Sequence, residues 1–208
     1  MKKTAILFAG LLMLAIPVGG KSLAQDTNLL GLYVDEQMSD NNLIVEDVGL
    51  VPVYVVLSHP VNPNFNGSGD PRDVDRVGGF ECGFVLDSAD FIVDSEFPMD
   101  HVNIGDLYEM IVGFATPYLV VGDDRAVTLV TLTIFTLAEL NSYIYLRPID
   151  APSIPGQMAY LDGEDDYSTW VVPMGPASGS WDIPVFSING GVVAMENASW
   201  GSVKSLYR

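Results

Sequence analysis

Cysteine and histidine are almost absent from this chain of 208 residues. It has one cysteine, Cys82, and two histidines, His59 and His101. A single cysteine excludes an internal disulfide, and neither histidine has a second metal ligand at helical or strand spacing. The chain also lacks a G-x-S-x-G turn and a glycine-rich phosphate loop before a helix. These absences disfavour catalysis, so we do not expect an enzyme.

Basic residues are also scarce. Lysine and arginine together number 9 against 27 aspartates and glutamates, which gives a formal net charge of −18. Such a charge repels nucleic acid and anionic membrane surfaces, so we expect no nucleic acid partner. Hydrophobic residues still make up 49% of the chain, too many for a disordered protein. The composition therefore indicates an acidic, folded domain.

The one extended apolar run lies near the N-terminus. Lys2 and Lys3 precede an apolar stretch at 5–18, and Ser-Leu-Ala at 22–24 places small residues where a signal peptidase reads. The run is shorter than the roughly 20 residues of a membrane-spanning helix, and no second run follows. We predict a cleaved signal peptide at 1–24 and a secreted or periplasmic mature protein without a membrane span. Because this segment holds three lysines and no acid, its removal lowers the net charge from −18 to −21.

The rest of the chain has the pattern of an all-β protein. Stretches of β-branched and aromatic residues are separated by clusters of glycine, proline, asparagine and aspartate. At 126–136, Val130, Leu132 and Ile134 alternate with threonines, as in a strand with one buried face. The same criteria predict strands at 29–34, 42–45, 53–57, 79–86, 90–94, 108–114 (alternatively a helical turn at 107–112), 143–147, 158–161 and 169–172. Many short strands predict an antiparallel β-sandwich of the jelly-roll kind over residues 25–187.

Cys82 lies within one of these predicted strands. Phe80, Cys82, Phe84 and Leu86 share one parity, and alternate residues of a strand face the same side. We therefore expect the thiol to point into the core as a small apolar group. The alternative is a reactive or intermolecular thiol.

Four segments occur in a characteristic order: VPVYVVLSHP, GGFECGFVLDSADFIVDSEFP, MIVGFATP and AVTLVTLTIFTLAELNSYIYLRP. Over about residues 29–148 this order resembles cohesins and related carbohydrate-binding-like modules of secreted bacterial proteins. The resemblance implies a jelly-roll sandwich that serves adhesion or scaffolding. Residues 151–186 depart from the pattern of a single module.

Two acidic loops are candidates for a calcium site. One contains Asp162, Glu164, Asp165 and Asp166, and the other, at 70–75, contains three aspartates. Calcium takes six to eight oxygen ligands, which loop carboxylates and backbone carbonyls can supply. Neither loop has EF-hand spacing, and two arginines lie within or beside the second loop. The alternative is that these acids are solvated turn residues.

Aromatic side chains in the later part of the chain are candidates for sugar binding. They are Tyr160, Tyr167, Trp170 and Trp181. Aromatic rings can stack on the apolar faces of sugars, but tyrosine and tryptophan also fill cores and sandwich edges. Both interpretations stay open at this point.

The last segment, 188–208, is predicted to be a tail with a short amphipathic helix. Trp200, Val203 and Leu206 or Tyr207 fall at helical spacing, and Lys204 and Arg208 lie at the C-terminal, negative end of the helix dipole. The candidate docking residues are Trp200, Lys204, Tyr207 and Arg208. The ending SWGSVKSLYR resembles the C-terminal tails of uncharacterised secreted bacterial proteins. We therefore consider a docking or sorting peptide for an envelope partner, against a terminal helix that lies on the sandwich or frays.

The sequence favours a secreted, non-catalytic binding or adhesion module for carbohydrate or an envelope protein. One alternative is a glycan-active hydrolase, which needs two carboxylates across a cleft. Another is a structural envelope protein that self-associates through exposed strand edges.

Overall fold

The computed structural model describes residues 27–138, 140–165 and 170–191, so the predicted signal peptide, Asp166, Tyr167 and the predicted C-terminal helix lie outside the described residues. The described strands are β1 (Leu29–Tyr33), β2 (Asn42–Leu43), β3 (Gly49–Ser58), β4 (Val61–Asn62), β5 (Arg72–Asp73), β6 (Arg76–Leu86), β7 (Phe91–Glu96), β8 (His101–Asn103), β9 (Glu109–Phe114), β10 (Leu119–Val120), β11 (Ala126–Thr136), β12 (Ser142–Arg147), β13 (Met158–Asp162), β14 (Val171–Pro176) and β15 (Phe186–Ile188). Within this part of the chain the only helical element is a 3₁₀ turn, η1 (Phe65–Gly67). The all-β class is confirmed.

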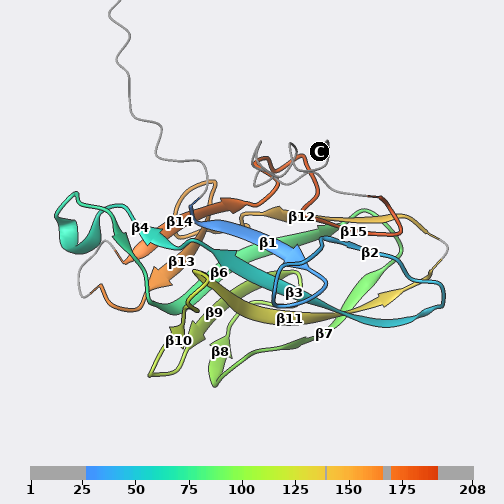
Figure 1. Ribbon diagram of the computed structural model, residues 1–208, viewed down its shortest axis with the longest axis horizontal. Helices are drawn as coiled ribbons and strands as arrows, with labels where there is room; N and C mark the ends of the chain where they lie inside the picture. Colours follow the sequence, from blue (N-terminus) through green and yellow to red (C-terminus); the bar gives the residue numbers. More distant parts are fainter. Residues whose placement is uncertain (1–26, 139, 166–169, 192–208) are drawn as a thin grey trace, which may run out of the picture.

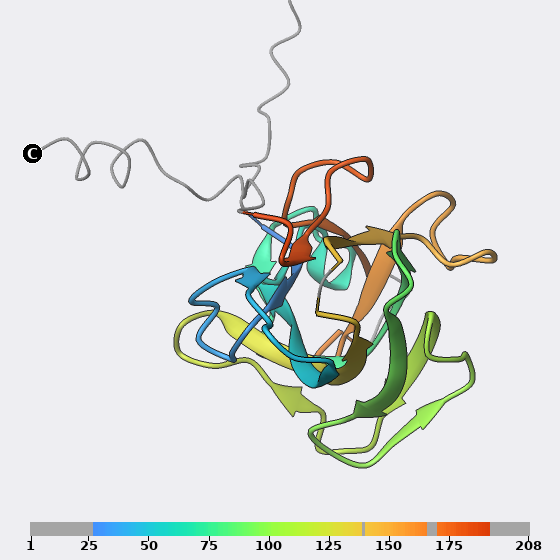
Figure 2. The same ribbon diagram turned by 90° about the vertical axis from the view of Figure 1, so that its right-hand side faces the viewer.

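Hydrogen bonds join most of these strands into one continuous sheet that folds into two facing layers (Figures 1 and 2). One layer, sheet I, contains β7, β11, β3 and β1 in this order. The other, sheet II, is centred on β6, which pairs with β9 along one edge and with β12 and β13 along the other. Strand β14 joins the two layers, since it pairs with both β1 and β13. The predicted β-sandwich is therefore present.

The prediction of a purely antiparallel sandwich is wrong, because the sheet is mixed. Strand β1 pairs with β14 in parallel, and β15 pairs with β2 in parallel. Each pair brings an early strand of the chain beside a late one. A tight hairpin forces neighbouring strands to run in opposite directions, whereas a long connection leaves both directions open.

The core lies between the inner sides of the two sheets. In β11, Val130, Leu132 and Ile134 are fully buried and the threonines between them are half-buried, as the alternation predicts. In β6, Phe80, Cys82 and Phe84 are buried in the same core. Burial raises the pKa of the Cys82 thiol above its ordinary value, so the inward-facing thiol is kept protonated. The predicted parity of this strand is confirmed.

Some local predictions need correction. The alternative of a helical turn at 107–112 is wrong, because β9 occupies this region and pairs with β6. His101 begins the short strand β8, which pairs with β9 and is not among the predicted strands. Among the residues that the structure describes, no helix is long and apolar enough to cross a membrane.

Candidate functional site

The outward side of sheet II carries three glycines on two neighbouring strands, β6 and β9. The core residues of β6 alternate with Gly79, Glu81 and Gly83, which therefore lie on the outward side. Gly79 pairs with Gly113 of β9, and Gly113 pairs with Val102 of β8, so these three residues lie side by side across the sheet. We call the outward side of sheet II around Gly79, Gly83 and Gly113 the glycine face.

Apolar side chains surround these glycines. Val102 is 66% exposed and Ile104, which follows β8, is 75% exposed. Ile111 of β9 and Leu161 of β13 are half-buried beside them. A Cβ atom at Gly113 would meet no atom within 4 Å, so the backbone is open to an approaching molecule there. Since the solvated face of a sheet is usually polar, this apolar face is suited to contact with a partner.

An ion pair crosses the glycine face. Arg147 of β12 donates to Glu109 of β9 over 2.7 Å, and its side chain lies over Gly83, which separates the two strands. A tyrosine and a valine, Tyr145 and Val85, follow in register beside this pair. The face therefore combines apolar area with one fixed charge pair.

A loop at 148–157 covers part of this face and is tied down by Glu81. The Glu81 carboxylate, which is buried, accepts hydrogen bonds from the backbone N–H of Ser153 over 2.7 Å and from its hydroxyl over 2.9 Å. Beneath the loop is a pocket of about 100 Å³. Its lining includes Glu81, Ile111, Ser153, Ala159, Leu161 and Val171. A pocket of this size and lining fits one apolar side chain of a partner.

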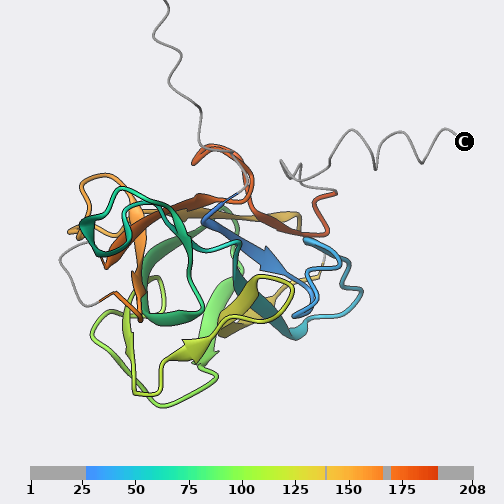
Figure 3. The ribbon, with the colours of Figure 1, turned by 60° about the vertical axis from the view of Figure 1, so that its left-hand side comes forward.

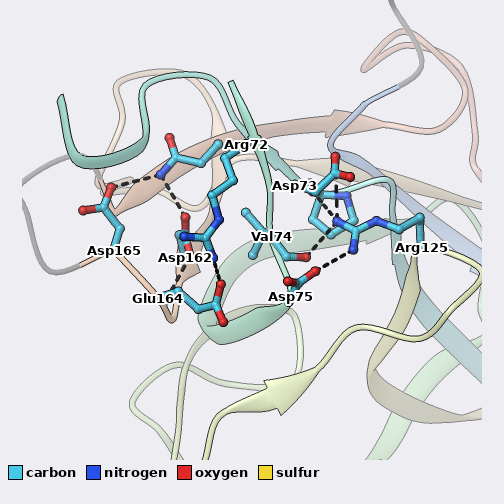
Figure 4. A network of polar contacts seen from close by, with 10 residues as sticks. Arg72, Asp73, Val74, Asp75, Arg125, Asp162, Glu164 and Asp165 are labelled. Atoms are coloured by element: carbon cyan, nitrogen blue, oxygen red, sulfur yellow. Dashed lines mark hydrogen bonds and ion pairs between the residues drawn. The ribbon is translucent and has the colours of Figure 1, made fainter. Parts of the chain in front are cut away.

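A separate polar cluster lies where the loop after β13 meets the loop around η1 (Figures 3 and 4). The side-chain amide of Asn62 donates to Asp162 and to Asp165, over 3.0 Å in each case. Asp165 also accepts from the backbone N–H of Asn66, and Asp162 from that of Glu164. Asn62, Asp162 and Asp165 are all buried, so the amide holds two carboxylates together away from water.

Arginines neutralise the acids around this cluster (Figure 4). Arg72, in the acidic loop at 70–75, pairs with Glu164, which lies in the same loop as Asp165. Arg125 pairs with Asp75 over 2.8 Å and lies 4.0 Å from Asp73. The acidic loop at 70–75 is thus neutralised mainly by Arg125, which the sequence did not indicate.

The predicted calcium ligands occupy different environments. Asp162 and Asp165 share the Asn62 amide, Glu164 pairs with Arg72, and Asp166 lies outside the described residues. In the described part of the chain, no group of three or more His, Cys, Asp or Glu side chains could hold a metal ion. Burial raises the pKa of Asp162, and the bond from Asn62 opposes this rise.

Calcium binding at this loop stays a prediction, and thermal melting tests it directly. A bound ion stabilises the folded state by mass action, so a chelator should lower the melting temperature and excess calcium should restore it. Equal melting temperatures in EDTA and in calcium chloride would rule this site out. Magnesium chloride at the same concentration is the control for ionic strength.

The described members of the predicted sugar-binding set differ in exposure. Tyr160 is fully buried, and its hydroxyl donates to the side chain of Asn28 over 2.9 Å. Trp170 is 47% exposed and Trp181 37% exposed, and Tyr167 lies outside the described residues. Tyr160 is therefore a core residue, whereas Trp170 and Trp181 are the described members of this set that offer ring surface to solvent.

The described residues offer no evident catalytic arrangement. The carboxylates of Asp162 and Asp165 are buried and both bonded to Asn62, so this pair does not flank an open cleft as glycoside hydrolysis requires. His59 and His101 are both exposed, and the His101 ring packs against Phe97 with ring centres 3.8 Å apart.

No protein-family model and no curated protein sequence matches the chain. Among solved structures, a non-cellulosomal cohesin from the hyperthermophilic archaeon Archaeoglobus fulgidus is similar at 10% identity, with a TM-score of 0.41 over 79% of this chain and 88% of that one. A type II cohesin domain from the cellulosome of Acetivibrio cellulolyticus is similar at 13% identity, with a TM-score of 0.45 over 80% of this chain and 98% of that one. Both are cohesins, the family that the order of segments resembles, and the likeness concerns the fold alone.

Proposed function

We propose that the mature chain is an exported, non-catalytic binding module that takes a protein partner on the glycine face. The observation that carries this proposal is the exposed apolar surface around Val102, Ile104 and Gly113. Side chains of this kind cost free energy when they face water, and contiguous apolar area on a folded domain is typical of an interaction site.

The shape of the surface supports a polypeptide partner. Gly113 is exposed, so a partner can approach the backbone closely there, and the pocket beneath 148–157 can receive one apolar side chain. The pair of Arg147 and Glu109 supplies a polar contact within the apolar area. A few buried anchors surrounded by polar groups are the usual arrangement at protein interfaces.

Two substitutions test the glycine face. We expect Val102→Asp and Gly113→Arg to weaken partner binding at least tenfold, because each places a charge, and in the second case also bulk, against the apolar surface. The measurement is capture from the secreted fraction of the producing cells, followed by calorimetric titration of the purified partner. Ile183→Asp, at an exposed apolar position outside the glycine face, is the matched control. Full affinity in both face variants would place the interface elsewhere.

Carbohydrate binding is the second candidate, and Trp170 is the observation that favours it. Its ring is exposed, and its backbone carbonyl bonds to Asp162 at the end of β13, next to Leu161 of the glycine face. Stacking on such a ring would give a glycan contact. A glycan array separates the two candidates, since binding that is lost in Trp170→Ala and kept in Val102→Asp would favour the sugar.

A further inference from the structure

Sheet I carries a second exposed apolar group on its outward side. Leu50 of β3, Phe135 of β11 and Phe91 of β7 lie directly opposite one another across three neighbouring strands. The rings of Phe91 and Phe135 are 5.2 Å apart between centres, and Leu50 is 62% exposed. We call these three residues the apolar row. The apolar row lies on sheet I and the glycine face on sheet II, so a molecule bound to the glycine face would leave the apolar row uncovered.

The described chain ends close to this row. Asn189 donates from its side-chain amide to the carbonyl of Ala138, and its side-chain oxygen accepts from the N–H of Val45. Ala138 follows Phe135 by three residues, which span at most about 11 Å. Gly191, the last described residue, is two positions beyond Asn189. Strands β2 and β15 lie at this same end of the sandwich (Figure 1).

Charge indicates what chemistry fits this surface. Strands β1, β3, β7 and β11 contain no lysine or arginine. Asp94 and Glu96, both exposed, continue β7 beyond Phe91. A ligand that combines apolar side chains with positive charge is therefore complementary to the row and its acidic neighbours.

Segment 192–208 has this composition. It lies outside the described residues, and its sequence places Trp200, Val203 and Tyr207 beside Lys204 and Arg208, with a single acid in the whole segment. Seventeen residues span about 26 Å as a helix and up to roughly 56 Å extended, which is enough to reach the row from Gly191. The rest of the mature chain is strongly acidic, so attraction favours this placement.

We propose that the apolar row of Leu50, Phe91 and Phe135 is the docking site of segment 192–208 of the same chain. Trp200 covers the row, and Lys204 and Arg208 lie toward the acids at the end of β7. A docked segment is shielded from other partners until something displaces it. This goes beyond the proposed function, which uses the opposite layer.

Quenching of Trp200 fluorescence by acrylamide tests the proposal in the full mature chain. The chain has three tryptophans, so Trp170→Phe and Trp181→Phe leave Trp200 as the only tryptophan, which is excited at a wavelength where tyrosine does not absorb. We expect Leu50→Asp and Phe91→Asp to raise the quenching constant of Trp200 at least twofold, because a charge in the row expels the ring. Both positions are exposed, so the fold is retained, which circular dichroism verifies. Ile183→Asp should change nothing.

Two outcomes would overturn the proposal. Equal quenching in the parent and both row variants would mean that Trp200 is not on the row. Protection that disappears on dilution, together with a dimer in light scattering, would mean that a second copy covers the row. Protection that is independent of concentration and is lost in both row variants supports docking within one chain.

Discussion

Replacing Asn62 by leucine should lower the free energy of unfolding by about 3 kcal/mol at neutral pH. Leucine has nearly the same shape, so the packing is kept. The two hydrogen bonds from the Asn62 amide to Asp162 and Asp165 are lost, and so is the bond that the Asn62 side-chain oxygen accepts from the N–H of Asn64. Both carboxylates then remain buried near each other without their shared donor. For a domain of this size the loss corresponds to a fall in melting temperature of about 6–12 °C.

The pH dependence of this loss identifies its cause. Burial raises the pKa of Asp162, so the stability linked to this group is present in acid and is lost as the pH rises through the folded-state pKa. In the leucine variant the hydrogen bond from Asn62, which lowers this pKa, is missing, so the folded-state pKa of Asp162 rises further. The difference in free energy of unfolding between the parent and Asn62→Leu should therefore have its full value at pH 7. It should become smaller as the pH falls through the folded-state pKa of Asp162.

Chemical denaturation at a series of pH values measures this difference. Asn41→Leu is the matched control, because Asn41 is also buried and donates to the main-chain carbonyl of Val185, which does not titrate. Its cost should be constant with pH. A cost of Asn62→Leu that is equally constant would show that the carboxylates are not what the amide stabilises.

The strands with regular alternation could be predicted from the sequence alone. Residues 126–136 form β11 with the expected buried and half-buried sides, and the parity of Phe80, Cys82 and Phe84 in β6 is as predicted. These strands are long, and their side-chain period records which side faces the core. Local pattern is sufficient where one side of a strand is buried along its whole length.

Several short strands and the pairing directions could not be predicted in this way. Strand β8 has three residues, two of them exposed, and exists because it pairs with β9. Strand β15 was also missed, since its partners β12 and β2 lie far away in the sequence. Such short strands form because they pair with other parts of the fold, and their own residues do not determine them.

The same limit applies to the polar sites. The acidic loop with Asp162 and Asp165 was recognised from its composition, but its partner Asn62 comes from the distant short strand β4 and carries no local signal. Glu81 occupies an outward position of β6, which predicts exposure. It is buried because the loop at 148–157 folds over it and supplies Ser153 as donor. Both cases depend on contacts between remote segments.

Replacing Gly79 by alanine should destabilise the protein by about 2–3 kcal/mol, although only one methyl group is added. A Cβ atom at Gly79 would lie 2.3 Å from the carbonyl oxygen of Val112 and 3.2 Å from the Cα atom of Gly113, both in the adjacent strand β9. Neither contact can be relieved by turning a side chain. Strands β6 and β9 must therefore separate, and the hydrogen bonds between them weaken along the centre of the glycine face.

Gly113→Ala provides a matched control on the opposite strand. Gly113 pairs directly with Gly79, yet its Cβ would meet nothing within 4 Å. Alanine loses less conformational freedom on folding than glycine, so this variant should be as stable as the parent or more stable by up to about 1 kcal/mol. Thermal melting of the two single variants measures the contrast. Equal melting temperatures would mean that β6 and β9 tolerate separation at this point, and the close approach of their backbones would then not shape the glycine face.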